Sequence, residues 1–151
     1  MSIRILLGSS SDMEHARVIQ DFAEEYGVKT HITVASAHKV PEMVVKLVED
    51  INALTEPTVV ITIVGMSNGL GGVVAGGCVH PVISCPAFKD HADYLVNIHS
   101  SVQMPSDVPA MTVIHPKNAA LAALRILAES DAKLQEKLLK RIKDLKATYK
   151  L

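Results

Sequence analysis

Residues 3–12 read Ile-Arg-Ile-Leu-Leu-Gly-Ser-Ser-Ser-Asp, and this stretch decides the fold. Ile3 to Leu7 is apolar except for Arg4, which predicts a short strand largely buried on both faces of a sheet. Gly8 ends the strand, and small hydroxyl residues lead into an amphipathic stretch. The same unit of a short apolar run followed by a helix pattern recurs along the chain.

Four further apolar, mostly β-branched runs predict strands, at residues 32–34, 59–64, 81–84 and 111–114. Amphipathic stretches predict helices, at residues 13–26, 41–54, 70–78, 92–102, 118–128 and 131–149. Alternating strands and helices with short connections predict a three-layer α/β/α domain around a parallel five-stranded sheet. We expect the doubly wound, flavodoxin-like strand order 2-1-3-4-5, with an extra C-terminal helix.

The composition sets further bounds. A chain of 151 residues predicts one domain over residues 1–151. With 48% hydrophobic and 21% charged residues, it is neither disordered, collagen-like nor a coiled coil. A net charge of −1 gives no overall attraction to nucleic acid or membranes. The two cysteines, the absence of a signal peptide and the lack of an 18-residue apolar run lead us to expect a reduced, cytoplasmic protein.

In an open parallel sheet, ligands bind beyond the carboxyl ends of the strands, where the loops after the first three strands are expected to meet. The first loop, Gly8 to Asp12, offers hydroxyls and the free amides of a helix N-terminus, which suit a phosphate. Asp12 would repel phosphate and suits a helix N-cap or the hydroxyls of a ribose. The alternative is a capping segment that binds no ligand.

The second loop places His38 beside Lys39, after Ser36, and so puts a proton carrier next to an anion-binding charge. Of the seven histidines, His38 has the strand-end position and the neighbours that favour function. The third loop, residues 65–72, reads Gly-Met-Ser-Asn-Gly-Leu-Gly-Gly and can present backbone amides to a carboxylate. Its glycines could instead simply ease the packing of a helix on the sheet.

The sequence gives little indication of a metal site or of a nucleotide-hydrolysing site. Cys78 and His80 form a C-x-H pair without a matching second pair, so we expect no metal site. No phosphate-binding loop of the G-x-x-x-x-G-K-[ST] type occurs. The three loops together predict proton transfer on a phosphorylated small molecule.

The combination of several motifs resembles the PurE family, the aminoimidazole ribonucleotide carboxylases and carboxyaminoimidazole ribonucleotide mutases of purine biosynthesis. The matching segments lie at residues 8–12, 36–39, 65–69, 84–86, 101–105 and 116–121. The resemblance implies a homo-octamer with sites at subunit junctions. It also implies carboxylation of the imidazole ring with CO2, without biotin, metal or ATP.

The resemblance also implies roles for single residues. His38 would move the proton of the reacting ring carbon. The phosphate and ribose of the substrate would be held by Gly8, Ser9, Ser11, Asp12, Ser36 and Lys39. The CO2 and the new carboxylate would be held by Gly65, Ser67, Asn68 and Gly69.

Two branches of the family remain open. Lys39, the Ser67-Asn68 pair, residues 84–86 and Lys117-Asn118 are similar to the branch that uses CO2 directly. That branch commonly has arginine where this chain has Met66, and residues 102–105 are more similar to the mutase branch. We therefore expect a carboxylase, with a mutase as the alternative.

Non-enzymatic interpretations also remain. A flavodoxin-like nucleotide-binding module would share the fold, although a flavin carrier would need more aromatic side chains than a chain without tryptophan offers. The basic end of the chain could be a nucleic-acid arm, but such faces are usually only solvated. It contains Lys133, Lys137, Lys140, Arg141, Lys143, Lys146 and Lys150. The apolar stripe of the last helix predicts packing on a neighbouring subunit, or alternatively on its own domain. The stripe consists of Leu134, Leu138, Ile142 and Leu145.

Overall fold

A computed structural model describes residues 1–149. Its core is one sheet of five parallel strands in the order β2-β1-β3-β4-β5. The strands are β1 (Ser2–Leu7), β2 (Lys29–Val34), β3 (Thr58–Ile63), β4 (Val82–Ser84) and β5 (Ala110–Thr112). The predicted five-stranded parallel sheet and its order are confirmed. Lys150, predicted to belong to the basic end of the chain, lies outside the described residues.

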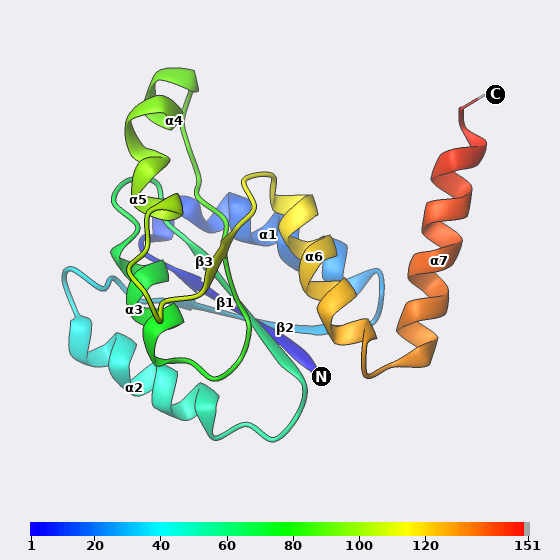
Figure 1. Cartoon of the computed structure of the whole chain (residues 1–151), viewed down its shortest axis with the longest axis horizontal. Coiled ribbons are helices and arrows are strands. Elements are labelled where there is room, and N and C mark those ends of the chain that lie inside the picture. Colours follow the sequence, from blue (N-terminus) through cyan, green and yellow to red (C-terminus); the bar gives the residue numbers. More distant parts are fainter. Residues whose placement is uncertain (150–151) are drawn as a thin grey trace.

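Seven α-helices surround the sheet within residues 1–149 (Figure 1). They are α1 (Met13–Glu24), α2 (Pro41–Asn52), α3 (Gly69–Gly77), α4 (His91–Asn97), α5 (His99–Val102), α6 (Pro116–Ala128) and α7 (Ala132–Ala147). A short 3₁₀ turn, η1 (Ser10–Asp12), leads into α1. None of these helices combines the length and the apolar character needed to cross a membrane.

Two separate hydrophobic cores lie on opposite faces of the sheet. One contains side chains of α1 and α6, and the other contains side chains of α2 and α3. Because successive side chains of a strand point to opposite faces, Val59 and Ile61 of β3 enter the first core and Val60 enters the second. Every residue of β3 is buried. The predicted three-layer α/β/α arrangement is therefore confirmed.

The edge strand β2 is longer than predicted. It begins at Lys29, which pairs with Ser2 of β1, whereas the apolar pattern indicated a start at Ile32. As an edge strand, β2 pairs with β1 on one side only. None of the six residues of β2 is buried. Backbone pairing, rather than apolar content, therefore defines its first three residues.

The single helix predicted over residues 92–102 is wrong, because two short helices, α4 and α5, occupy this segment. The break lies at Ile98. The Ser100 hydroxyl donates to the Asn97 carbonyl at 2.9 Å, and the Ser101 amide donates to the Ile98 carbonyl instead of to Asn97. A serine side chain that competes for a backbone carbonyl in this way interrupts the regular helical bonding.

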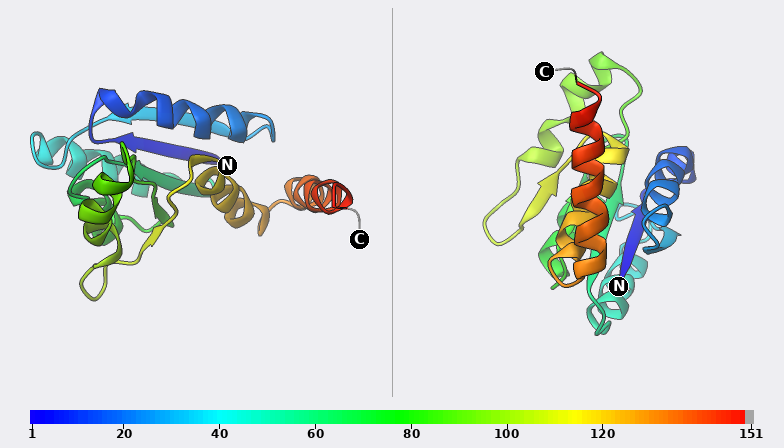
Figure 2. Two further views of the ribbon diagram at one scale, coloured as in Figure 1. Left: turned by 90° about the horizontal axis from the view of Figure 1, so that it is seen from above. Right: turned by 90° about the vertical axis from the view of Figure 1, so that its right-hand side faces the viewer.

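Helix α7 packs on its own domain through its first half. Leu134 and Leu138 are buried in the core formed with α1 and α6. The Arg141 guanidinium lies 4.9 Å from the centre of the Phe22 ring. Leu145 is 57% exposed, and Figure 2 shows the end of α7 standing clear of the sheet layers. Packing of this second half on a neighbouring subunit stays a prediction.

Candidate active site

A cavity of about 810 Å³ opens at the carboxyl ends of the first four strands. Nine of the eleven predicted site residues line it: Gly8, Ser9, Ser11, Asp12, Ser36, His38, Lys39, Gly65 and Ser67. The structure therefore brings together residues from three loops that are up to 59 positions apart in the chain, counting from Gly8 to Ser67. Asn68 and Gly69 do not line the cavity and lie beneath its wall.

The first loop presents two hydroxyls at a helix start. Ser9 caps the 3₁₀ turn η1, because its Oγ accepts from the Ser11 amide at 3.2 Å, and it also accepts from the Ser11 hydroxyl at 2.9 Å. Asp12 stands at the N-cap position of α1, yet its side chain makes no capping hydrogen bond. The carboxylate of Asp12 thus lines the cavity without a structural role in the helix.

The second loop is a tight turn that projects His38. The Ser36 carbonyl accepts from the amides of Lys39 and Val40 at 3.2 and 2.9 Å, so the chain reverses around His38. Pro41 then begins α2, where its fixed φ is compatible with a helix. His38 and Lys39 are both exposed.

The imidazole of His38 rests on the backbone of Gly69. A Cβ atom built on Gly69 would lie 2.6 Å from Nε2 and 2.8 Å from Cε1 of His38. No side chain larger than that of glycine fits there unless the imidazole moves. The second and third loops therefore meet at this one contact.

The third loop is fixed by a buried hydrogen-bond network around Asn68. Its Nδ2 donates to the Ser84 hydroxyl at 2.9 Å, and its Oδ1 accepts from the Gly71 amide at 2.9 Å as the N-cap of α3. Its own amide donates to the Ser100 hydroxyl at 3.1 Å. These bonds use both ends of the Asn68 side chain inside the protein. The role of Asn68 in binding a carboxylate stays a prediction.

We expect a Gly71→Ala variant to lose about 1–3 kcal/mol of folding stability. A Cβ at Gly71 would lie 2.5 Å from both Asn68 Oδ1 and Ser84 Oγ, so the buried network must shift. Denaturant unfolding measures the loss. The control is Gly72→Ala, whose Cβ would meet only the side chain of Met104, with Sδ at 3.6 Å and Cε at 3.9 Å. An equal loss in both variants would contradict the expectation.

Sequence reasoning missed several residues of the cavity wall. Glu14 and His15 come from the first turn of α1, and Phe88, Lys89 and Asp93 follow β4. The loop after β4 ends at the same edge of the sheet as the three predicted loops, so its position alone was a usable signal. Ser84 and Ser100 carried no such signal, because their contacts depend on how the elements pack.

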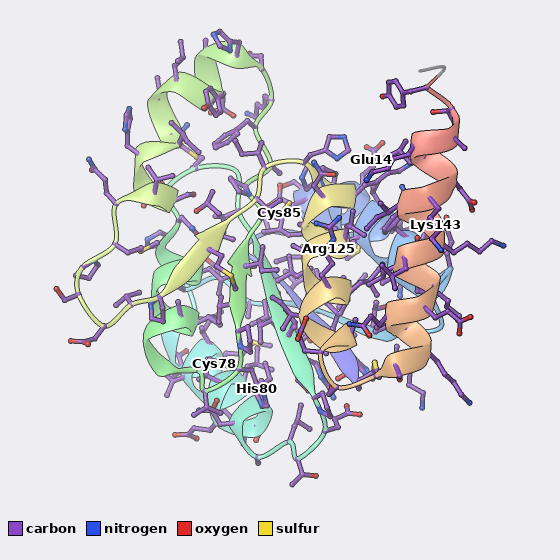
Figure 3. The ribbon with its side chains drawn as sticks, turned by 45° about the vertical axis from the view of Figure 1, so that its right-hand side comes forward. Glu14, Cys78, His80, Cys85, Arg125 and Lys143 are labelled. Carbon is purple, nitrogen blue, oxygen red and sulfur yellow. The ribbon has the colours of Figure 1, made fainter. Side chains whose placement is uncertain are left out.

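His15 stands between the cavity and a buried thiol. Its Nε2 lies 3.6 Å from Sγ of Cys85, and burial lowers the pKa of His15. Burial also raises the pKa of Cys85 to about 12, so this thiol stays protonated at neutral pH. Figure 3 shows Cys78 and His80 together at the opposite end of the sheet from Cys85, away from the cavity.

The lowered pKa of His15 predicts how folding stability depends on pH. Below the ordinary histidine pKa of 6.5, the unfolded chain binds a proton that the folded protein resists, so stability falls as pH drops from 6.5 toward the lower folded value. A His15→Gln variant should lose less stability over this range. Thermal unfolding of both proteins at several pH values tests this, and parallel curves would contradict it.

Residues 2–148 match the family described as AIR carboxylase. The chain belongs to the AIR carboxylase family. This AIR carboxylase family member is 41% identical over 132 residues to a phosphoribosylaminoimidazole carboxylase of Treponema denticola, an alignment that covers 87% of this chain and 82% of that protein. The crystal structure of Treponema denticola PurE superposes with a TM-score of 0.90 at 36% identity and covers 97% of this chain and 92% of that one.

Relatives of both branches are similar to this AIR carboxylase family member. An N5-carboxyaminoimidazole ribonucleotide mutase of Methanocaldococcus jannaschii is 40% identical over 141 residues, 91% of this chain and 85% of that protein. The multifunctional protein ADE2 of Caenorhabditis elegans is 41% identical over 126 residues, and the chain spans 29% of its length. The predicted PurE resemblance and the flavodoxin-like fold are confirmed.

Proposed function

We propose that this protein catalyses the reversible carboxylation of 5-aminoimidazole ribonucleotide at ring carbon C4 with CO2, in purine biosynthesis. One observation carries the proposal. The imidazole of His38 is set on Gly69 at the wall of a cavity that also holds the hydroxyls of Ser9 and Ser11 and the cation of Lys39. A proton carrier and a phosphate-binding loop thus share one cavity.

The phosphate of the substrate would be held by the first loop and by Lys39. Ser9 and Ser11 can turn their hydroxyls from each other to phosphate oxygens, and the amides at the start of α1 add a partial positive charge. Gly8 packs tightly against the neighbouring loop, because a Cβ at this position would lie 2.8 Å from Val64 Cγ1, so a larger residue would shift the loop that lines the cavity. Asp12 would accept from the ribose hydroxyls, and Ser36 would line the same part of the cavity.

The reaction needs a proton acceptor more than an activated nucleophile. The imidazole ring carries an amino group that makes C4 electron-rich, so C4 can form the new bond to the carbon of CO2. The proton on C4 must then leave to restore the aromatic ring, and His38 would take it. In the reverse direction His38 returns this proton as the carbon–carbon bond breaks. Such acid–base help typically contributes about 10²–10⁴-fold.

The third loop would hold CO2 and the product carboxylate. Ser67 and Gly65 line the cavity, so the Ser67 hydroxyl can donate to an anion bound there. The Asn68 network keeps that backbone in place, and Gly69 keeps it in contact with the imidazole. Binding the ribonucleotide and CO2 in a fixed relative orientation would contribute a further part of the rate enhancement.

The mutase is the second candidate function. Similarity to the mutase of Methanocaldococcus jannaschii supports this function. Similarity to the carboxylases of Treponema denticola and Archaeoglobus fulgidus supports the direct use of CO2. The two reactions share the nucleotide and differ in the source of the carboxyl group. Lys39 and the Ser67-Asn68 pair lead us to prefer the carboxylase.

A pair of assays separates the two functions. One supplies 5-aminoimidazole ribonucleotide and bicarbonate without ATP, and the other supplies the N5-carboxylated nucleotide. Fast turnover in the first assay supports the carboxylase. Turnover confined to the second would replace it with the mutase, and no turnover in either would reject both.

We also propose that the protein works as a cytoplasmic homo-octamer with CO2 and the ribonucleotide as its small-molecule partners. Support for assembly comes from apolar side chains that are exposed beside the cavity: Leu95, Val96 and Val102 on α4 and α5 are 55%, 74% and 56% exposed. Light scattering coupled to gel filtration measures the mass. A monomeric protein with full activity would contradict this part of the proposal.

A further inference from the structure

We propose that Lys89, in the segment that joins β4 to α4 (Figure 1), binds the carboxylate of the carboxylated nucleotide. Lys89 and the uncharged Met66 both line the cavity, and Met66 is 73% exposed. This inference rests on the proposed function, because it names the residue that recognises the product of that reaction.

The charges of the cavity wall show why a second cation matters. Three carboxylates line the cavity, those of Asp12, Glu14 and Asp93, against two ammonium groups, those of Lys39 and Lys89. Without Lys89 the wall would carry three negative charges and one positive charge. A nucleotide with a phosphate and a carboxylate would then meet net repulsion at the end of the cavity that lacks Lys39.

The strand order places the two lysines at opposite ends of the cavity. Lys39 follows β2 and Lys89 lies beyond β4, and the ends of β1 and β3 lie between them. Neighbouring strands are about 4.8 Å apart, so the ends of β2 and β4 are separated by roughly 14 Å. A cavity with one cation at each end suits a ligand with two separate anionic groups. The phosphate is assigned to the Lys39 end, which leaves the carboxylate to Lys89 and to the neighbouring loop of Ser67.

The backbone of Lys89 is held in place by Asp93, and its exposed side chain makes no ion pair in the described part of the chain. Its backbone amide donates to Asp93 Oδ2 at 2.9 Å, and Asp93 Oδ1 accepts from Asn97 Nδ2 at 2.6 Å. The carboxylate of Asp93 is therefore bonded to the backbone and to an amide. Within residues 1–149, no carboxylate lies within 4.0 Å of the Lys89 ammonium group. The ammonium remains available to a ligand in the cavity.

The test compares three nucleotides that differ only at C4: the unsubstituted ribonucleotide, the 4-carboxylate and the uncharged 4-carboxamide. Calorimetry on the full chain gives their affinities for the wild type, Lys89→Ala, Lys89→Arg and the control Lys133→Ala on α7. We expect Lys89→Ala to lower the affinity for the carboxylate nucleotide by about tenfold, the loss typical of a hydrogen bond to a charged group. The affinities for the other two nucleotides should fall by less than about twofold. Lys89→Arg and Lys133→Ala should retain the wild-type affinities.

A second variant tests whether a guanidinium group at position 66 can replace the ammonium group of Lys89. Met66→Arg combined with Lys89→Ala should recover most of the lost affinity for the carboxylate nucleotide. Equal weakening of all three nucleotides, or no weakening of any, would overturn the inference. These affinities are independent of turnover: a wild type that binds the nucleotides but shows no carboxylation would reject the proposed function and leave the role of Lys89 to be judged by binding alone.

Discussion

A His38→Asn variant is expected to lose about 10²–10⁴-fold in carboxylation rate while still binding the ribonucleotide. Asparagine keeps a polar side chain of similar reach but cannot take up a proton. The phosphate and ribose contacts proposed for Ser9, Ser11 and Asp12 are untouched by the change, so affinity for the nucleotide should fall by less than about threefold, a small part of the binding energy. Single-turnover kinetics and calorimetry measure the two quantities.

The matched control is His31→Asn, which replaces an exposed histidine on the edge strand β2 outside the cavity. It should keep the wild-type rate. Because His38 is exposed, its replacement should leave the unfolding temperature unchanged. A His38→Asn protein with near-normal turnover would reject the proton-transfer role, and one that fails to fold would assign His38 a structural role.

A Gly69→Ala variant should lose about tenfold to a hundredfold in rate, because the added methyl group displaces the imidazole of His38, the proposed proton acceptor. The methyl carbon would lie 2.6 Å from His38 Nε2, so the ring must move by the better part of an ångström. Displacements of about 1 Å can cost on the order of 10²-fold in catalysis. The nucleotide should bind nearly as well as before, so the effect should appear in kcat.

The control for this variant is Gly76→Ala on the same helix, whose Cβ would meet only Val108 Cγ2 at an ordinary 3.6 Å. Alanine is favoured over glycine in helices by about 1 kcal/mol, so neither variant should unfold the protein. Full activity of Gly69→Ala would show that the contact with His38 does not position the imidazole. Equal loss of activity in both variants would point to α3 as a whole instead.

The fold was predictable where strands are buried on both faces, because such strands appear in the sequence as short apolar runs. The runs that became β1 and β3 are apolar because side chains on both faces enter a core, and two-sided burial requires helices on both sides. The first half of β2 lacks such an apolar run, since it lies at the sheet edge and consists of the polar residues Lys29, Thr30 and His31. The break between α4 and α5 depends on one hydroxyl of Ser100, which no periodicity reveals.

The candidate site was predictable to the extent that it follows from strand ends. The rule that loops meet beyond the carboxyl ends of parallel strands brought nine residues to one cavity. The same rule could not distinguish a side chain that faces the cavity from one that faces the interior. Asn68 carries the donors and acceptors of a ligand-binding residue, and the structure uses them for Gly71 and Ser84. Lys89 follows β4 and so could have been found by the same rule, whereas His15 lies within α1 and its place in the cavity wall depends on how that helix packs.

The bond between Ser100 and Asn68 has a mechanical consequence. The Ser100 hydroxyl accepts from the Asn68 amide and donates to the Asn97 carbonyl, so the arm formed by α4 and α5 is linked to the backbone next to Gly69. Because Gly69 contacts the imidazole of His38, a shift of this arm would also shift the backbone on which the imidazole rests. A second protein that binds the exposed apolar side chains of the arm is therefore expected to change the alignment of His38, the proposed proton acceptor.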